Sequence, residues 1–469
     1  MENKIEILSE KKIKEWIAKN RNSMIEDIKT LVNIKSVKTA KEGKYVFGVG
    51  VGKALEKALS IAERDGFDTV NDNYYYGLVG YPGKRKGKIG IFAHLDVVPE
   101  GNGWKYLPYN AMVKDGYIIG RGAGDNKGPA IASLYAMKYL KENEVVLNKT
   151  IELYLGCSEE SGMEDIAYYM ERNCPPSFSF TPDVSFPVCY AEKGILELKV
   201  QSKSKLLGDL KSIHGGISSN SVAPEAEAFI ENPNQDTIKL LKAFSDIYVT
   251  KEKNGVKIKA MGVGKHAAFP EGSVNAIAIL CKVLSKIQQL NQDTKVLCCH
   301  LAQVLEDYYG KALGIAYEDE ITGKLTHTCG LICAANGYIE ADFNIRYPVT
   351  APRDEMKQKL YEIFENKGFT IRKYYDNFPM HVKPDSKEVE LLTRICNENL
   401  GIELEPYTMG GGTYARKIPN TVGYGPGRSD RLLKWGNGHE ADECVYIENL
   451  EKAIKIYIEA LVELDEIVE

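Results

Sequence analysis

The chain has 469 residues, enough for roughly two or three domains. Its hydrophobic fraction of 44% and charged fraction of 27% are ordinary for a globular protein, and its net charge of −5 gives no reason to expect nucleic acid or an anionic membrane as a partner. The sequence shows no apolar signal-peptide core and no stretch of about 18 apolar residues, and the ten cysteines lack the paired spacing of a structural zinc site. We therefore expect a cytosolic protein with reduced cysteines.

The first half of the sequence predicts alternating helices and strands. Residues 51–66 have helical spacing and stop at Gly66, which is typical of a helix C-terminus. Two short apolar runs, 88–93 and 150–156, predict buried strands, and a helix is expected between them over 128–142. This order indicates an α/β fold with a mostly parallel sheet and helices on both faces. In such sheets ligands bind beyond the carboxyl ends of the strands.

The middle of the chain predicts a different arrangement, an α+β insert. Alternating patterns over 196–202 and 337–347 predict strands. Between them, 223–231, 235–247 and 274–290 are predicted to be helices.

Helical spacing returns after the insert, with a last helix expected over 447–464. We therefore expect a catalytic domain formed by two segments, 1–194 and 385–469. The intervening residues, 195–384, would form an inserted lid domain.

Polar residues follow both predicted strands. His94 and Asp96 come directly after the first, on one face of an extended segment, where the Asp96 carboxylate would accept the second ring N–H of His94. Glu159 and Glu160 follow the second strand, and Asp125 precedes the helix that is expected between the two strands. Each has a simpler interpretation on its own: a strand-end histidine, acidic residues at a helix start, and a helix N-cap.

Hydrolysis of an amide at neutral pH requires a strong nucleophile and an electrophile for the developing negative charge. Two divalent metals about 3.5–4 Å apart supply both, by acidifying a shared water and polarising the carbonyl. Such a site requires histidines and carboxylates from several strand ends. Of the seven histidines, His94 stands beside such carboxylates, whereas His439, in a glycine-containing segment, could also be an ordinary loop residue.

Five separated motifs together resemble one family, the co-catalytic di-zinc metallopeptidases that include aminoacylase, glutamate carboxypeptidase and desuccinylase. In chain order they are His94-Leu95-Asp96-Val97-Val98-Pro99, Gly120-Arg121-Gly122 with Asp125-Asn126-Lys127-Gly128, Glu159-Glu160-Ser161-Gly162, Pro182-Asp183, and His439. The resemblance spans nearly the whole chain. Within the family, the length of the insert and the segment Gly410–Arg416 resemble the PepV-type dipeptidases. The implied activity is hydrolysis of dipeptides with a free C-terminal carboxylate by a metal-bridging water.

The resemblance also implies a role for each residue of the site. Asp125 would bridge two divalent ions, for which zinc is expected and manganese or cobalt are alternatives. Glu159 would be the general base, and Asp96 would orient His94. One departure is Ser158, since the family often has aspartate before the glutamate pair. The implied metal ligands are His94 and Asp183 for one ion, Glu160 and His439 for the other, and Asp125 for both.

The insert would contribute groups that contact the substrate. His266, in Gly264-Lys265-His266-Ala267, resembles the lid histidine that stabilises the tetrahedral oxyanion. Asn220 and Arg346 match substrate-binding positions, with Arg346 forking onto the C-terminal carboxylate. Gly411 and Gly412 would offer backbone N–H groups to the same carboxylate. Without the resemblance, Arg346 could be a surface arginine and the glycine loop a flexible turn.

Two other functions stay open. An N-acyl amino acid deacylase or a carboxypeptidase would use the same metal site on another substrate. A homologue that only binds metal or peptide is a second alternative, but the complete ligand set with Glu159 argues against it. The segment Gly48–Gly52 lacks the lysine–serine/threonine pair of a phosphate loop. We expect a small peptide as substrate and a monomer, because an insert of about 190 residues can supply the surface that shorter dimeric relatives obtain by pairing.

Overall fold

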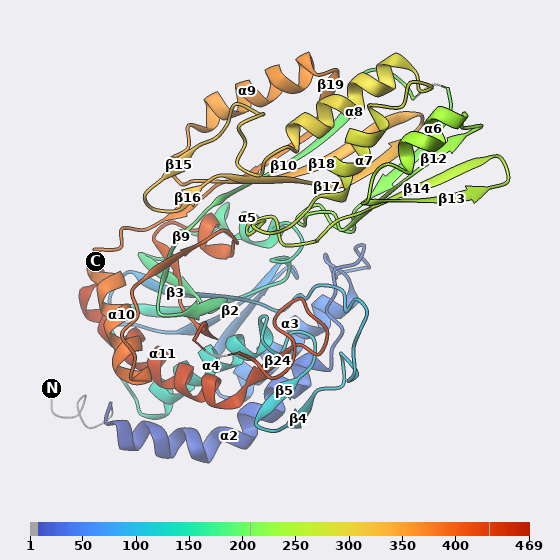
Figure 1. Ribbon diagram of the computed structural model, residues 1–469. Coiled ribbons are helices and arrows are strands. Elements are labelled where there is room, and N and C mark those ends of the chain that lie inside the picture. The colour runs from blue at the N-terminus through green and yellow to red at the C-terminus, as the bar shows by residue number, and fades with distance from the viewer. Residues whose placement is uncertain (1–7, 207, 431) are drawn as a thin grey trace. The chain divides into compact units, whose positions relative to one another are not determined.

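The computed structural model describes residues 8–206, 208–430 and 432–469 (Figure 1). The chain divides into two compact units. Unit 1 comprises the residues up to Tyr190 together with His381–Tyr407 and Thr413–Glu469, and unit 2 comprises Ala191–Met380 and Thr408–Gly412. The division into a catalytic domain and an inserted lid domain, with limits at 194 and 384, stays a prediction. None of the described helices combines the length and the apolar character that crossing a membrane requires.

Unit 1 is built on a sheet that, over the described residues, has nine strands, and its four central strands, β6, β3, β7 and β22, are parallel. The strands at both sides of this centre pair antiparallel. The order is β1 (Asp68–Asp72), β2 (Tyr76–Tyr81), β6 (Thr150–Gly156), β3 (Lys88–His94), β7 (Phe178–Thr181), β22 (Thr421–Gly423), β9 (Cys189–Glu192) and β20 (Met380–His381), with β21 (Tyr407–Met409) paired to β9.

Alternate residues of the central strands pack into two apolar clusters, one on each face of the sheet. Ile91 of β3 and Leu153 of β6 belong to the larger cluster, whereas Phe92 and Tyr154 belong to a smaller aromatic one. The larger cluster includes residues of α2 (Glu10–Val32), α3 (Val49–Arg64), α4 (Lys127–Glu142), α10 (Lys387–Leu400) and α11 (Ile447–Ile467). The smaller includes α5 (Glu164–Met170) and the 3-10 helix η1 (Tyr414–Lys417). Short strands outside the sheet are β4 (Met112–Lys114), β5 (Tyr117–Ile119), β8 (Val184–Phe186), β23 (Pro426–Arg428) and β24 (Cys444–Tyr446).

The α/β fold class with helices on both faces is confirmed, although the parallel pairing is limited to the four central strands. β1 and β2 form a hairpin, and strands joined by a short turn pair antiparallel. Near the site the expected elements are present: β3 and β6 follow the two apolar runs, and α4 lies between them in the chain.

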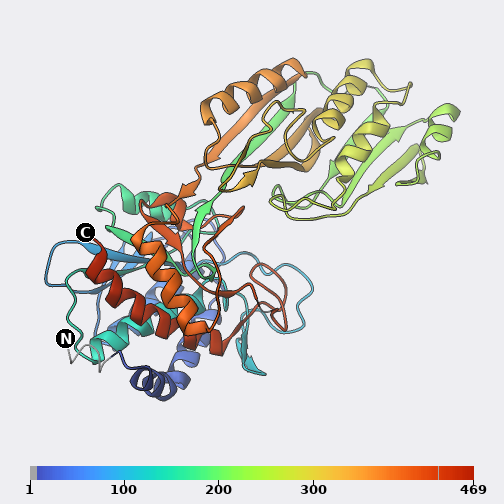
Figure 2. The same ribbon diagram turned by 60° about the vertical axis from the view of Figure 1, so that its left-hand side comes forward.

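Unit 2 contains a sheet of eight strands within the described part of the chain, with antiparallel pairing throughout. Its helices lie along one face (Figure 2). Residues of the other face form partly exposed ion pairs such as Lys257–Glu227. The strand order is β13 (Ile247–Glu252), β14 (Gly255–Met261), β12 (Glu225–Glu231), β11 (Leu210–Gly215), β17 (Thr326–Ala335), β18 (Tyr338–Tyr347), β10 (Gly194–Ser202) and β19 (Phe369–Asn377). The remaining elements are α6 (Gln235–Leu241), α7 (Ala276–Leu284), α8 (Gln292–Val304), α9 (Arg353–Asn366), β15 (Glu318–Asp319) and β16 (Gly323–Lys324).

One predicted helix of the insert is wrong, because residues 223–231 contain the strand β12. Alanine and glutamate favour helices, but here they alternate, so that Ala226 and Ala228 are buried while the glutamates face the other side of the sheet. The partner strand β14 supplies lysines that pair with these glutamates. Tertiary pairing therefore overrides the local preference for helix.

The other two predicted helices of the insert are present but shorter. α6 ends at Leu241, before the strand β13 begins, and α7 covers only part of 274–290. Asn275 caps α7 and joins it to β17: its Oδ1 accepts the N–H of Ile277, and its Nδ2 donates to Thr328 Oγ1 and to the Cys329 carbonyl oxygen.

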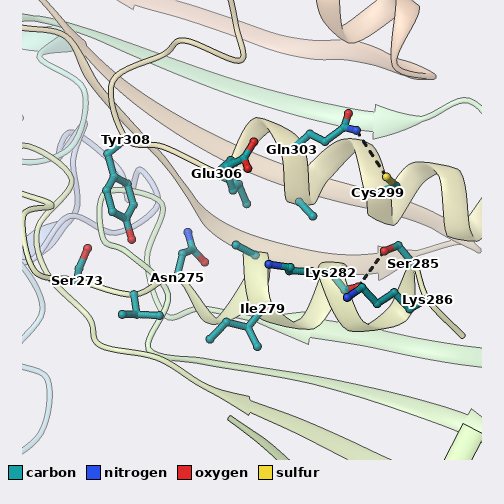
Figure 3. Close-up of a pocket in the computed structure, with 14 residues that line it drawn as sticks. Ser273, Asn275, Ile279, Lys282, Ser285, Lys286, Cys299, Gln303, Glu306 and Tyr308 are labelled. Atoms are coloured by element: carbon teal, nitrogen blue, oxygen red, sulfur yellow. Dashed lines mark hydrogen bonds between the residues drawn. The ribbon is translucent and has the colours of Figure 1, made fainter. Parts of the chain in front are cut away.

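A groove of about 560 Å³ lies between α7 and α8 (Figure 3). Lys282, Lys286 and Glu306 are among its lining side chains. None of the site residues predicted from the sequence lines this groove.

The first prediction concerns His327, which is fully buried in β17. Burial lowers the pKa of His327 to about 4, although Asp307 acts in the opposite direction. An unfolded histidine has a pKa of about 6.5, so the unfolded chain binds the proton more readily between these values. The free energy of unfolding should therefore fall by up to about 3 kcal/mol as the pH decreases from about 6.5 to 4.

Urea unfolding of the wild type and of His327→Leu at pH 7 and pH 5 measures this contribution. The leucine variant should lose less stability on acidification than the wild type. The exposed His381 provides the control, since His381→Leu should keep the wild-type pH dependence. Equal pH dependence in wild type and His327→Leu would contradict the assignment.

Candidate metal centre

The predicted metal ligands of unit 1 meet at the carboxyl edge of the parallel strands. His94 is the last residue of β3, Glu160 follows β6, and Asp183 follows β7. These three strands are neighbours in the sheet, so their ends are adjacent. Asp125 lies just before α4, and His439 comes from the segment that precedes β24.

Asp125 stands between two pairs of side chains. Its Oδ1 is 3.0 Å from His94 Nε2, which is also 3.6 Å from Asp183 Oδ2. Its Oδ2 is 3.2 Å from His439 Nε2, which is 3.0 Å from Glu160 Oε1. Each oxygen of one carboxylate therefore faces a different histidine–carboxylate pair.

Ligand atoms are close enough to hold an ion in two overlapping groups. His94, Asp125 and Glu160 form one, and His94, Glu159 and Asp183 form the other, with the ligand atoms of each group within 4.8 Å of one another. Glu159, expected as a general base, thus lies within reach of the same place as Asp183.

The charges of this cluster are unbalanced in a buried environment. Burial, with Asp125 next in importance, raises the pKa of Glu160 to about 7 and that of Asp183 to about 6. Burial also raises the pKa of Glu159 well above its ordinary value. Hydrogen bonds to Asp125 and Glu160 raise the pKa of His439 to about 11. The carboxylates are therefore stabilised in their charged form by positive charge placed among them.

Divalent cations fit this need. Carboxylate and imidazole are ligands that zinc, manganese and cobalt accept. Glu159 Oε1 is also buried, and within the described residues it has no hydrogen-bond partner. Such a buried oxygen is costly unless a cation, a water or a substrate group meets it.

Asp96 and the two glutamates are held by a defined set of hydrogen bonds. The Asp96 carboxylate accepts the backbone N–H groups of Glu159, at 3.0 Å, and Glu160, at 3.2 Å. His94 Nδ1 lies 3.0 Å from the Asp96 carbonyl oxygen and 3.6 Å from its Oδ1. The Asp96 carbonyl oxygen is thus nearer to the His94 ring than the Asp96 carboxylate is. The carboxylate mainly fixes the turn that carries Glu159 and Glu160.

Two side chains that position ligands were not singled out from the sequence. Asn126 Nδ2 donates to Asp183 Oδ1 over 2.9 Å, and Asn126 Oδ1 accepts the backbone N–H of His94. Asp165 Oδ2 accepts the N–H groups of Cys157 and Ser158, directly before the glutamates. Asn126 stands inside a recognised motif, but its partners come from other strands, so spacing alone gave no signal for its contacts.

The remaining predicted residues lie in unit 2, where the segment with His266 pairs with the segment with Asn220. The N–H of Ala267 donates to the Asn220 carbonyl oxygen, and Thr326 Oγ1 donates to the Ala267 carbonyl oxygen. His266 itself is exposed, and its Nδ1 accepts the N–H of Ala268 over 3.2 Å.

Arg346 meets the glycine loop from the end of β18. It is 5% exposed, and its Nη1 donates to the Gly410 carbonyl oxygen over 2.9 Å. A side chain at Gly410 would come within 2.8 Å of the Ala268 side chain, so the glycine loop also packs against the His266 segment. Gly411 and Gly412, half-buried, continue this loop. The structure therefore brings the predicted residues of unit 2 into one region.

A family model described as Peptidase family M20/M25/M40 matches residues 90–463. The chain belongs to this family. It is therefore an enzyme of the metal-dependent peptidase class, in agreement with the family resemblance of its motifs and with the clustered candidate ligands.

Whole-length relatives agree with this assignment. YtjP of Bacillus subtilis (strain 168) is 32% identical over 96% of this chain and 98% of that protein. A Beta-Ala-Xaa dipeptidase of Lactobacillus delbrueckii subsp. lactis is 31% identical over 96% of this chain and 98% of its own length. Among solved structures, the di-peptidase Dug1p from Saccharomyces cerevisiae has a TM-score of 0.62 at 13% identity, covering 98% of this chain and 100% of that one, which supports the fold.

Proposed function

We propose that this M20-family enzyme is a dipeptidase with two divalent metal ions, most simply zinc. The observation that carries the two-ion proposal is the Asp125 carboxylate, whose two oxygens face separate histidine–carboxylate pairs. A carboxylate in this position can bridge two ions about 3.5–4 Å apart. A relative named as a Beta-Ala-Xaa dipeptidase supports a dipeptide as the substrate.

His94, Asp183 and Asp125 would hold one ion, and His439, Glu160 and Asp125 the other. When bound, these ions would acidify a water and polarise the scissile carbonyl. Glu159 would take the proton of the attacking water and deliver it to the leaving amine. Its Oε1 is suited to this because burial raises the Glu159 pKa, which makes the carboxylate a stronger base.

His266 would donate a hydrogen bond to the oxyanion of the tetrahedral intermediate. Since Nδ1 accepts the N–H of Ala268, the neutral ring carries its proton on Nε2. That nitrogen is then a donor at an exposed position. The backbone therefore selects the tautomer that oxyanion stabilisation needs.

Arg346, Asn220 and the glycine loop would bind the substrate backbone. The Arg346 guanidinium is fixed by Gly410 and by Asn344 Oδ1, at 2.7 Å, so little side-chain entropy is lost when it binds a carboxylate. We propose that it takes the C-terminal carboxylate, with N–H groups of Gly411 and Gly412 beside it. We further propose that the enzyme acts as a monomer in the cytosol. A deacylase or carboxypeptidase on the same metal site is the alternative.

Metal content and substrate preference test the function directly. The apo-protein should take up two equivalents of zinc, manganese or cobalt, and chelators should abolish its activity. It should hydrolyse free dipeptides far faster than N-acyl amino acids or longer peptides. Full dipeptidase activity with one ion or none would refute the two-ion site, and a preference for N-acyl amino acids would indicate the deacylase.

Substitutions of Glu159 and Glu160 should distinguish proton transfer from metal binding. Glu159→Gln should lower kcat by at least about 10²-fold with both ions bound, because it removes the base and keeps the shape. Glu160→Ala should instead weaken one ion. Elemental analysis beside steady-state kinetics distinguishes the two, with the exposed Glu164→Gln as the control. A Glu159→Gln enzyme that keeps most of its kcat would show that the base is another group.

The groups of unit 2 should affect kinetics and leave metal content unchanged. His266→Ala should lower kcat by about 10²–10³-fold, the usual cost of losing one oxyanion donor. Arg346→Ala should raise KM for free dipeptides, whereas a dipeptide amide should be a poor substrate of the wild type and lose little more in this variant. The exposed His214→Ala and Arg372→Ala are matched controls. Near-normal kcat in His266→Ala, or amides cleaved as well as free acids, would contradict these roles.

A further inference from the structure

A buried ion pair lies next to the metal centre, outside the proposed ligand set. Arg121 and Glu443 are 1% and 0% exposed, and Arg121 Nη1 donates to Glu443 Oε2 over 2.6 Å. They are 322 residues apart in the sequence. Arg121 stands four residues before Asp125, and Glu443 stands four residues after His439. A fully desolvated pair at this place needs an explanation, because burying two charges contributes little net stability.

The second oxygen of Glu443 holds the segment that leads to Asp125. Glu443 Oε1 accepts the backbone N–H groups of Gly122, Gly124 and Asp125, each over 3.0 Å. Gly122 has a φ of +86°, and a side chain at Gly124 would lie 3.3 Å from the Cys444 carbonyl oxygen. Glycine thus allows the backbone to wrap around a single carboxylate oxygen, which fixes the main chain of Asp125.

The guanidinium extends the same network to the segment of His439. Arg121 Nη2 donates to the carbonyl oxygens of Glu100, at 3.3 Å, and His439, at 3.4 Å. This segment also passes close to Asp125, since a side chain at Gly438 would come within 3.0 Å of Asp125 Oδ2. One ion pair therefore contacts the backbone of both residues that are proposed to share an ion.

We propose that Arg121 and Glu443 are a positioning pair, which holds Asp125 and His439 in the arrangement for metal binding before an ion arrives. This inference rests on the proposed two-ion site. Asp125 and His439 belong to separate segments, and without a fixed backbone each would pay the conformational entropy of ordering at the moment of binding. Groups behind metal ligands typically change metal affinity by about 10–100-fold when they are substituted.

Cobalt(II) binding to the apo-protein provides the test, because its visible absorption reports on coordination geometry as well as occupancy. Competition with a chromophoric chelator gives both affinities, and His439→Ala shows the spectrum of the ion held without this histidine. In Glu443→Gln, the ion held by His439 should bind about 10–100-fold more weakly with shifted absorption bands. Arg121→Lys, which keeps the charge but not the forked donors, should lose less.

Glu405→Gln is the matched control, since it removes the same charge from unit 1 at an exposed side chain far from Asp125 and His439 in the sequence. It should leave both affinities and the spectrum unchanged. An equal loss in Glu405→Gln and Glu443→Gln would reveal a general charge effect and overturn the inference.

Removing one partner of a buried pair also destabilises the fold, so circular dichroism must show that each apo-variant is folded at the titration temperature. Arg121→Met/Glu443→Leu removes both charges and should fold. Its metal affinity should still be reduced, because the N–H groups of the Asp125 segment have lost their acceptor. If this double variant does not fold, Glu443→Gln decides. Wild-type affinities and spectrum in the folded variants would mean that the pair serves only stability. A wild type that binds fewer than two ions would contradict the two-ion site instead.

Discussion

Acidic side chains gathered at one edge of a sheet repel one another, and the structure of unit 1 around the metal centre is organised to hold them there. Buried carboxylates that are not proposed as ligands accept backbone N–H groups of the segments that carry the ligands. Asp96 accepts two such groups, Asp165 two and Glu443 three. Because backbone N–H groups in loops must find acceptors in any case, these carboxylates satisfy them without consuming ligand oxygens. The ligand carboxylates are then left to face one another, an arrangement that becomes favourable once cations lie between them.

The sheet supplies the other half of this arrangement. Parallel neighbours β6, β3 and β7 end at a common edge, so residues from distant parts of the sequence reach one place without long loops. Strand ends fix a main chain more tightly than loops do, because strand pairing and packing on both faces restrain them. Asp125 and His439 lie outside the sheet, and the His439 side chain is 55% exposed. The Arg121–Glu443 pair contacts the segments of both residues, so this additional anchor lies where the sheet provides none.

Much of this could be predicted from the sequence, and the limits have physical causes. Apolar runs at 88–93 and 150–156 predicted β3 and β6, since a buried strand bounded by polar residues has a strong local signature. The helix predicted over 223–231 was wrong because alanine and glutamate favour helices locally. In the structure, burial of the alanines on one side of the sheet and ion pairs of the glutamates with lysines of β14 stabilise a strand instead. The family motifs pointed to the candidate ligands, but the contacts of Asn126 and Glu443 reach residues 57 and more than 300 positions away in the sequence, which no local pattern contains. Positioning contacts are therefore the part of a site that spacing reveals least.

The distribution of anchors also bears on how substrate preference and chemistry can vary independently. The candidate metal ligands lie in unit 1, each tied to a strand end, to a helix start or to a buried ion pair. His266 and Asn220 are exposed in unit 2 and are held through main-chain hydrogen bonds such as that of Ala267 with Asn220. Main-chain anchoring leaves side-chain identity free, so neighbouring positions can change without disturbing the ring of His266. Under the proposed function, the ligand set determines that an amide bond is broken, while the segments around His266 and the glycine loop determine which amide. Relatives with the same ligands can then differ in substrate through unit 2 alone.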